Sequence, residues 1–301
     1  MKRFAKSACL TVAKRRGYLT SSRLTRLILS SLRFGFAPPP DGLTYPGGSK
    51  ASCVISIDFD HLTKSPNSTA SKWIPIASDY LLARNREGTS DLLALSEKYR
   101  VPMTWAICGR TAAEDRQSYE MILHSSQPQE VGIHTYSHID VSGCSEEELE
   151  TDLQRCLEVL KLPVSPKTFI FPWNRQGHFE ILEKFGFETY REQARSISYP
   201  RKMNGLWNIS PTYYVDTKSY GAQNLIKKYL DLCLSWRSVF HLWFHPWSVI
   251  DESIGKRFAE DTLDPIFSYL KEKKDSGDLA LCTMGQLASF FQESQTGTDV
   301  K

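Results

Sequence analysis

Two histidines and two aspartates in this chain have the types and spacing of a metal-centred hydrolytic site. His134 and His138 are four positions apart in the segment His-Thr-Tyr-Ser-His, a spacing that lets both imidazoles reach one ion from a single short turn. Asp58 and Asp60 follow shortly after the apolar run 53–55. Three protein ligands, Asp60 and the two histidines, leave the open fourth position that is typical of catalytic zinc. The pattern therefore predicts a metal-dependent hydrolase.

Two further side chains are suited to proton transfer. Asp58 lies two positions before Asp60 on an extended segment, so both carboxylates share a face and one of them can stay free of the metal. A free carboxylate beside a metal-activated water can take its proton. His245 ends an apolar segment, 238–244, and a histidine there can donate a proton to a departing amine. Taken alone, Asp-x-Asp is explained as well by a turn or an exposed strand end as by a metal site. His245 alone is explained as well by a structural role at the end of its strand as by catalysis.

The elements that must position these residues alternate from about residue 50. Strands are expected over 53–57, 103–108, 130–134, 167–171, 238–244 and 279–282, and helices over 89–99, 145–160, 178–185, 224–234, 257–273 and 285–291. Alternation of this kind predicts an α/β fold with a parallel sheet and crossover helices. The candidate residues lie where strands end, as active-site residues do in α/β barrels.

Composition is that of an ordinary globular protein. The 301 residues are 41% hydrophobic and 24% charged, which allows one large domain with a sizeable core. No stretch is apolar for long enough to span a bilayer. The net charge of +3 conceals an asymmetry, because residues 1–36 carry nine Lys and Arg and no acidic residue. The remaining body has no basic patch interleaved with aromatics, so no nucleic-acid partner is expected.

The basic N-terminal segment is expected to be a partly helical arm, 1–40. It is not a convincing signal peptide, because the apolar run 8–13 is followed at once by three basic residues. Apolar residues then recur at helical spacing among arginines: Leu24, Leu27, Ile28 and Leu32. Such a helix either packs its apolar face on the domain or lies on an anionic membrane surface. Peripheral membrane contact through residues 1–36 is therefore one expectation for this arm.

The cysteines indicate a reducing compartment. There are seven of them, an odd number, with no Cys-x-x-Cys pair, so they are interpreted as reduced thiols of a cytoplasmic protein. The domain organisation expected after the arm is a catalytic domain over 50–292 and a flexible tail over 293–301. The sequence leaves the oligomeric state open.

Taken together, these segments resemble the polysaccharide deacetylase family, also called the NodB-homology or carbohydrate esterase family 4 group. The first motif of that family supplies a catalytic-base aspartate and a metal aspartate, which fall on Asp58 and Asp60 with the Asp-x-Asp spacing of a divergent branch. The second motif, His-(Ser/Thr)-x-x-His, is matched by His134 and His138. The last motif, a histidine that follows a hydrophobic strand, is matched by His245.

One expected residue is missing from the third motif. The family places an arginine two residues before a proline, but Ile170 holds that position before Pro172. Arg175 and Arg191 are the candidates to replace it. The fourth motif, Asp-Trp, is not located. The missing arginine bears on the orientation of Asp58 more than on metal binding.

The resemblance covers roughly residues 50–290 and implies a distorted (β/α) barrel of about seven parallel strands. It implies that Asp60, His134 and His138 hold Zn²⁺ or another divalent ion such as Co²⁺ or Ni²⁺, with Asp58 as base and His245 as acid. The implied substrate is an N-acetylated saccharide, either a polysaccharide or a lipid-linked or nucleotide-linked amino sugar. Candidate substrate contacts are Pro172, Trp173, Asn174, Arg175 and Trp247, with a backbone N–H near Asn174 as an oxyanion donor.

Three alternatives remain open at the level of sequence. The Asp-x-Asp pair is also found in glycosyltransferases, where it binds the metal of a nucleotide sugar. Ile170 in the arginine position favours a catalytically weak or inactive glycan-binding protein on the same fold. The divergent first motif also allows a hydrolase of another, cyclic amide.

Overall fold

The computed structural model describes residues 43–60, 79–192, 199–250 and 258–296. The N-terminal arm expected over 1–40 lies outside the described residues. None of the helices in the described ranges is long and apolar enough to cross a membrane. The six cysteines in these ranges are all free thiols, as the cysteine pattern predicts.

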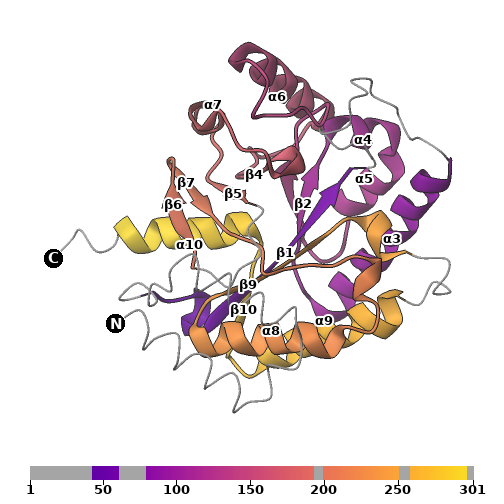
Figure 1. The fold of residues 1–301 in the computed structure, drawn as a ribbon, viewed down its shortest axis with the longest axis vertical. Helices are drawn as coiled ribbons and strands as arrows, with labels where there is room; N and C mark the ends of the chain where they lie inside the picture. The colour runs from indigo at the N-terminus through magenta and orange to yellow at the C-terminus, as the bar shows by residue number, and fades with distance from the viewer. Residues whose placement is uncertain (1–42, 61–78, 193–198, 251–257, 297–301) are drawn as a thin grey trace.

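A curled, mostly parallel sheet forms the centre of the molecule (Figure 1), with the strand order β6-β7-β5-β4-β3-β2-β1-β9-β8 and with β10 paired to β1. The strands are β1 (Ala51–Phe59), β2 (Thr104–Ile107), β3 (Glu130–Ile133), β4 (Thr168–Ile170), β5 (Thr189–Arg191), β6 (Arg201–Met203), β7 (Leu206–Asn208), β8 (Tyr213–Tyr214), β9 (Val239–Phe244) and β10 (Leu279–Leu281). Among the strands of the described ranges, only β6 and β7 pair antiparallel. The expected distorted (β/α) barrel is confirmed, and the short strands β5, β6, β7 and β8 are additions that the sequence pattern does not predict.

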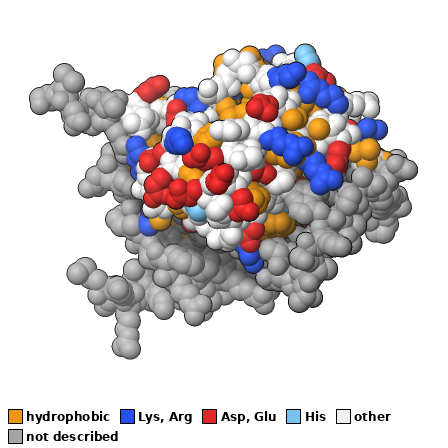
Figure 2. Space-filling view, turned by 90° about the horizontal axis from the view of Figure 1, so that it is seen from above, with side chains coloured by type: hydrophobic (Ala, Val, Ile, Leu, Met, Phe, Trp, Pro, Cys, Tyr) orange, Lys and Arg blue, Asp and Glu red, His pale blue; other side chains and the backbone are white. Residues whose placement is uncertain are grey.

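Helices cover the outside of this sheet (Figure 1). They are α3 (Asp79–Tyr99), α4 (Gly109–Glu114), α5 (Arg116–Leu123), α6 (Glu146–Leu160), α7 (Phe179–Lys184), α8 (Gln223–Trp236), α9 (Asp264–Asp275) and α10 (Met284–Thr296). Helix α6 begins with the expected capping box, in which Ser145 and Glu148 each accept from the backbone N–H of the other. In the view from above (Figure 2), acidic side chains gather on the left of the face and basic ones on the right.

Helices α4 and α5 are not predicted by the sequence pattern, and three other elements differ from their expected bounds by more than two residues. Helix α3 begins at Asp79 rather than at residue 89, because tertiary packing extends it beyond its amphipathic part. A π-helical turn, Ala259–Leu263, precedes α9 where a continuous helix from 257 was expected. Helix α10 continues to Thr296, so the segment expected to be a tail from residue 293 begins inside a helix.

Strand side chains alternate between two apolar clusters. Successive residues of a strand point to opposite sides of a sheet, so Ile55, Ile57 and Phe59 of β1 pack outward against the helices. The inward cluster fills the barrel end near α10 and includes Val54, Ala106, Ile170, Val239, Met284, Leu287, Ala288 and Phe291. Helix α10 thus closes the N-terminal end of the barrel with apolar side chains.

The inward face of β1 changes from apolar to charged along the strand. Val54 belongs to the inner apolar cluster, whereas Ser56, Asp58 and Asp60, at successive inward positions, are buried polar groups. Buried polar groups require partners in the interior. The C-terminal end of the barrel is therefore where a polar site must be assembled.

Candidate functional site

Three buried side chains converge on one point at the C-terminal end of the barrel. The Asp60 Oδ2 atom lies 3.3 Å from His138 Nε2 and 3.5 Å from His134 Nε2. One ligand atom from each of these residues lies within 4.8 Å of the others, which makes them a group that could hold a metal ion. Neighbouring ligand atoms of a tetrahedral site with bonds of about 2.0–2.1 Å are about 3.3–3.4 Å apart. The spacing of the carboxylate and imidazole atoms fits such a site.

The His134–His138 loop follows β3 and is held in a strained conformation. Thr135 and His138 both have positive φ, 61° and 58°, which is costly for residues other than glycine and typical of functional sites. The buried carboxylate of Asp152, on α6, fixes the loop by accepting from the backbone N–H groups of Tyr136 and Ser137 and from the Ser137 hydroxyl. The contact with α6 therefore orients both imidazoles toward Asp60.

Hydrogen bonding favours a cation between these side chains. His134 Nδ1 lies 2.7 Å from the Ile170 carbonyl oxygen, which can only accept, so Nδ1 carries the proton. Nε2, the other ring nitrogen, faces the Asp60 carboxylate, and in this tautomer it can act as an acceptor or bind a metal ion. Asp60 Oδ1 is also buried and has no hydrogen-bond partner among the residues that the structure describes. Facing acceptors and a buried unpaired carboxylate oxygen are what a divalent cation would satisfy.

The protonation states suit metal binding. Burial works to raise the pKa of Asp60, but the nearby imidazoles of His245, His134 and His138 outweigh it and hold that pKa well below its ordinary value. Burial lowers the pKa of His138 more than the neighbouring Asp60 carboxylate raises it. An ionised carboxylate and a neutral imidazole are the forms that bind a metal.

Asp58 is held by an arginine from a distant strand. Arg191 Nη1 donates to Asp58 Oδ1 at 2.7 Å, and Nη2 donates to Oδ2 at 2.6 Å. The two side chains are 5% and 0% exposed, so the pair lies inside the barrel. Burial works to raise the pKa of Asp58, but the charge and hydrogen bonds of Arg191, with His134 and His245, bring that pKa below its usual value. Asp58 is therefore ionised near neutral pH.

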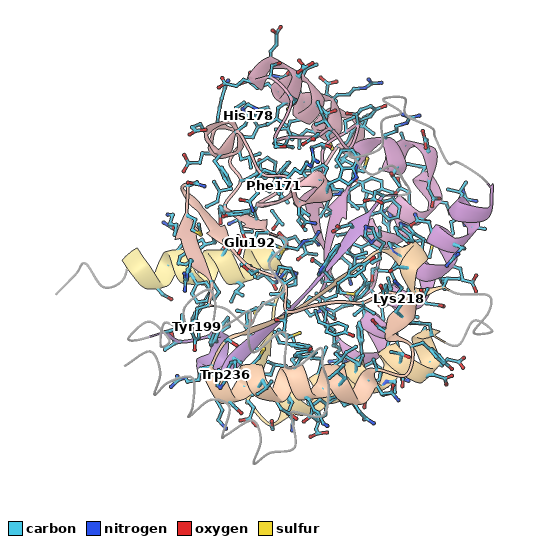
Figure 3. The ribbon with its side chains drawn as sticks, viewed as in Figure 1. Phe171, His178, Glu192, Tyr199, Lys218 and Trp236 are labelled. Carbon is cyan, nitrogen blue, oxygen red and sulfur yellow. The ribbon has the colours of Figure 1, made fainter. Side chains whose placement is uncertain are left out.

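Arg191 occupies the place of the arginine that is missing from the third motif. Ile170, on β4, pairs in register with Arg191, on the neighbouring strand β5. Figure 3 labels Phe171 and Glu192, the residues that follow these two strands. Residues paired in register on adjacent parallel strands point to the same side of the sheet. The guanidinium thus enters the barrel at the same level from the next strand.

The other candidate replacement, Arg175, does not reach Asp58. Its Nη1 atom pairs with Asp140 Oδ2 at 2.5 Å in a partly exposed ion pair. That pair links the loop after His138 to the turn that contains Arg175. Of the two arginines considered from sequence, Arg191 alone contacts Asp58.

His245 lies beside both aspartates. Its Nε2 atom is 3.7 Å from Asp60 Oδ2 and 3.9 Å from Asp58 Oδ2, and 14% of the side chain is exposed. On the opposite side of the ring, the Tyr214 hydroxyl lies 3.5 Å from Nδ1. The indole of Trp247 stacks on the imidazole with ring centroids 4.5 Å apart. His245 is thus the partly exposed imidazole of the cluster.

The turn that contains His245 and Trp247 is anchored by helix α3. The 3₁₀ turn Pro246–Val249 follows His245, and Arg84 Nη2 donates to the Trp247 carbonyl oxygen at 3.1 Å. Gly88 allows the close approach, because a Cβ at that position would overlap the Pro246 carbonyl oxygen. The Trp247 indole N–H donates to the backbone oxygen of Asp60 at 3.0 Å, so it fixes the strand end.

The turn after β4 brings further candidate residues to the site. Pro172 is buried, and the rings of Trp173 and His138 meet edge to face with centroids 4.4 Å apart. Trp173 and Asn174 have positive φ values of 52° and 57°. The N–H groups of Asn174 and Arg175 donate to the carbonyl oxygens of Phe171 and Pro172. These two N–H groups are occupied within the turn, which argues against the expected oxyanion donor at Asn174.

Sequence reasoning missed two supporting residues. Asp152 falls between Leu149 and Leu153 on the buried face of α6, and an acidic residue on a buried helix face is a signal that something polar must lie opposite. Tyr214 lies on a two-residue strand that no periodicity in the sequence marks. Arg191 was named from sequence only as one of two replacements.

Comparisons with known proteins agree with this geometry. Residues 67–177 match the family model described as polysaccharide deacetylase, a range that includes His134, His138 and Pro172. A peptidoglycan deacetylase of Helicobacter pylori is 30% identical over 105 residues, 34% of this chain. This part of the chain is thus similar to the polysaccharide deacetylase family. The aligned stretch is 35% of that relative's length, so the chain matches about a third of it.

Solved structures show a similar fold over most of this chain. Proteins assigned as polysaccharide deacetylases from Mycobacterium smegmatis and Pseudomonas aeruginosa PAO1 have TM-scores of 0.67 and 0.63, at 18% and 13% identity. They cover 86% and 87% of this chain, and 95% and 97% of their own chains are matched. The Puue allantoinase has a TM-score of 0.60 at 12% identity, with 85% and 94% coverage. At these identities the likeness concerns the fold alone.

Proposed function

We propose that this protein is a metal-dependent hydrolase that removes N-acetyl groups from an amino-sugar glycan. The observation that carries the proposal is the convergence of a three-residue ligand group, an ionised carboxylate and a partly exposed imidazole at one end of the barrel. These are the groups that water-dependent cleavage of an amide requires. The family match supports the same chemistry.

The ligand group is Asp60, His134 and His138, whose fit to a divalent ion rests on their spacing and on the buried Asp60 oxygen without a partner among the described residues. When bound, Zn²⁺ or another divalent ion such as Co²⁺ or Ni²⁺ would supply Lewis-acid polarisation and a water of lowered pKa. The Ile170 carbonyl keeps His134 in the tautomer that presents Nε2. Asp152 keeps the loop in place behind both histidines.

Asp58 is the proposed general base. Arg191 engages both of its oxygens, and each carboxylate oxygen retains a second lone pair that can accept a proton. Asp58 takes the proton of the attacking water as the water oxygen bonds to the amide carbon. Because Arg191 favours the ionised form, Asp58 is ready to accept that proton at neutral pH.

His245 is the proposed general acid. Its Nε2 atom lies next to both aspartates, and its partly exposed ring can reach a substrate. It gives a proton to the nitrogen as the C–N bond breaks, so that acetate and a free amine leave. Tyr214 orients the ring through Nδ1, and Trp247 limits its rotation by stacking.

The proposed substrate is an N-acetylated saccharide. The partly exposed indoles of Trp173 and Trp247 flank the site through their contacts with His138 and His245, and aromatic faces bind sugar rings by their apolar side. The relative from Helicobacter pylori is a peptidoglycan deacetylase. We therefore place polymeric or lipid-linked N-acetylhexosamines first among the candidates.

Arg191 also weakens two of the alternative functions. In an Asp-x-Asp glycosyltransferase both carboxylates face the metal and the nucleotide sugar, but both oxygens of Asp58 are engaged by Arg191. The alternative of an inactive glycan-binding protein rested on Ile170 in the position of the expected arginine. Arg191 supplies a guanidinium at the same level from β5, which removes that argument. A cyclic-amide hydrolase remains the second candidate, since an allantoinase shares the fold.

The decisive experiment couples metal analysis to product release. The purified chain is loaded with Zn²⁺, Co²⁺ or Ni²⁺ and incubated with chitopentaose, peptidoglycan fragments, UDP-N-acetylglucosamine and allantoin. We expect about one bound ion per chain, and acetate from a saccharide with none from the control variant Asp58→Asn, which retains its metal. Turnover of allantoin without acetate release would instead establish the second candidate. Metal-loaded protein with no activity on any of them would contradict both.

A further inference from the structure

A chain of hydrogen bonds inside the barrel lies behind the Asp58–Arg191 pair. Arg191 Nη1, which donates to Asp58, also lies 3.0 Å from Ser56 Oγ. Ser56 Oγ lies 2.8 Å from His241 Nε2, and His241 Nδ1 lies 3.0 Å from the Ile209 carbonyl oxygen. All three side chains are fully buried. In the part of the chain that the structure describes, the hydrogen bonds of Arg191 go to Asp58 and Ser56 only.

Donor and acceptor chemistry allows one direction through this chain. A guanidinium only donates, so Ser56 Oγ accepts from Arg191. The Ser56 hydroxyl must then give its own proton to His241 Nε2, which has to be unprotonated. A carbonyl oxygen only accepts, so His241 Nδ1 carries the proton and donates it to Ile209. His241 is thus neutral, and burial, with the nearby Arg191 charge, lowers its pKa to about 3.

The chain of hydrogen bonds links strand β5 to the paired strands β1 and β9, neither of which pairs with β5. Ser56 and His241 lie on the neighbouring strands β1 and β9, but Arg191 lies on β5, which β4, β3 and β2 separate from β1. The contact therefore crosses the barrel interior and adds nothing to sheet pairing. It fixes the plane of the guanidinium, which Trp243 covers with its ring centroid 4.2 Å from Cζ.

A nearby serine provides the contrast. Ser52 lies four residues before Ser56, on the same face of β1, and is equally buried. Its hydroxyl donates to the Ala280 carbonyl oxygen at 3.2 Å, so this hydrogen bond is made to the backbone and not to the arginine. Burial and strand position alone thus do not connect a serine to the arginine.

We propose that Ser56 and His241 are positioning residues that orient Arg191 so that both guanidinium nitrogens hold the general base Asp58. Neither touches the substrate. The proposal rests on the proposed function for its catalytic consequence, but the hydrogen-bond direction can be tested without any activity. A bidentate pair needs coplanar groups, and a third hydrogen bond from Nη1 restricts rotation of the guanidinium out of that plane.

The first test is kinetic and uses the metal-loaded full chain with chitopentaose. Ser56→Ala should lower kcat roughly tenfold, the size expected for one lost hydrogen bond to a charged group, with KM and metal content unchanged. Ser56→Thr, which keeps the hydroxyl, should restore kcat. Ser52→Ala is the matched control and should leave kcat unchanged. Equal losses in Ser56→Ala and Ser52→Ala would overturn the proposal.

A double-mutant cycle separates positioning from general destabilisation. Arg191→Lys keeps the charge but cannot form the two-nitrogen contact. If Ser56 acts through the guanidinium, Ser56→Ala should lower kcat by less than about twofold in the Arg191→Lys background, because coupled residues are not additive. A full tenfold further loss would show that Ser56 acts by another route and would overturn the proposal.

The second test reads the proton positions by ¹⁵N NMR of histidine-labelled protein at neutral pH. His241, assigned by loss of its signals in His241→Asn, should carry its proton on Nδ1 and none on Nε2. Ser56→Ala should move the Nε2 resonance and leave Nδ1 protonated. A proton on Nε2 would overturn the proposed hydrogen-bond relay from Arg191 through Ser56 to His241. If no saccharide releases acetate, the proposed function fails, while this measurement still decides the relay.

Discussion

His134 and His138 lie on one five-residue loop, whereas Asp58 and Arg191 come from strands β1 and β5, which three other strands separate in the sheet. The first pair is assembled locally, because the loop after β3 and its contact with Asp152 aim both imidazoles. The second pair exists only because the sheet curls until β5 faces β1. One half of the site thus depends on a short segment and the other on the whole barrel.

This difference predicts which property each half of the site controls. In the proposed site, the ligand atoms of Asp60, His134 and His138 would bind the metal directly, so loss of a ligand should remove the metal. The Asp58–Arg191 pair is buried, so loss of one partner leaves an uncompensated charge in the interior. We therefore expect changes in the first half to appear in metal content and changes in the second half to appear in stability and turnover.

The largest expected effect is loss of the metal. Asp60→Ala and His134→Ala should each weaken metal binding by more than about 100-fold. Loss of a residue that only supports a metal ligand lowers affinity by up to about 100-fold, and loss of a ligand itself should cost more. Asp58→Asn should keep one ion per chain, because Asp58 faces Arg191. Metal content after dialysis, measured by atomic emission, separates the two halves. Equal retention in Asp60→Ala and Asp58→Asn would break the comparison.

The next effect concerns the buried arginine. Arg191→Ile should lower the free energy of unfolding by roughly 3–5 kcal/mol, because Asp58 is left buried without its partner, while the metal stays bound. Chemical denaturation measures this change. Because Ile170 and Arg191 pair in register, the exchanged variant Ile170→Arg/Arg191→Ile should recover part of the stability and of the turnover.

The exchanged variant also tests the idea that Arg191 occupies the place of the missing arginine. A guanidinium returned to β4 enters the barrel at the same level as before. If the exchanged variant is no more stable than Arg191→Ile alone, positions 170 and 191 are not equivalent for an arginine and the interpretation is wrong. If Arg191→Ile itself is as stable as the wild type, the ion pair has no structural role.

A smaller effect is expected at the helix that supports His245. Alanine in place of a helical glycine usually stabilises a helix by about 0.5–1 kcal/mol, but Gly88→Ala would drive its Cβ into the Pro246 carbonyl oxygen. The displaced turn should lower kcat about tenfold without loss of metal. Gly143→Ala, where the nearest atom lies 3.8 Å away, is the control. Equal kcat in the two variants would contradict this role of α3.

The smallest effect is a change in how stability depends on pH. The pKa of His241 is about 3 in the folded protein because of burial, with Arg191 lowering it further and Asp58 raising it. In the unfolded chain it is about 6.5. Between these values the unfolded state binds a proton that the folded state does not, so His241 lowers stability as the pH falls below about 6.5, by at most about 1.4 kcal/mol per pH unit.

His241→Phe removes this proton uptake. The free energy of unfolding of the variant should therefore fall less steeply between pH 6.5 and 4.5 than that of the wild type, whatever its absolute stability. Denaturation curves at several pH values give the two slopes. Parallel slopes would show that His241 is protonated equally in both states, which would also contradict the neutral relay.

The sequence by itself predicted that Asp60, His134 and His138 come together, and it predicted the fold class. His134 and His138 are separated by three residues, and Asp58, Asp60 and His245 lie at or just beyond the ends of apolar strands. Local spacing and the rule that parallel strands end together were therefore sufficient. The structure brings these five residues together. The alternation of strands and helices similarly predicted the barrel, because each element's period is encoded within its own residues.

Only the tertiary structure decided the rest. The sequence offered Arg175 and Arg191 for the missing arginine, and the register of β4 with β5 selected Arg191. The early start of α3, the strands β5 to β8 and the neutral His241 were likewise set by packing. A two-residue period shows which side of a sheet a residue faces, but which strand lies opposite is fixed by how the barrel curls. Long-range partners therefore become visible only in three dimensions.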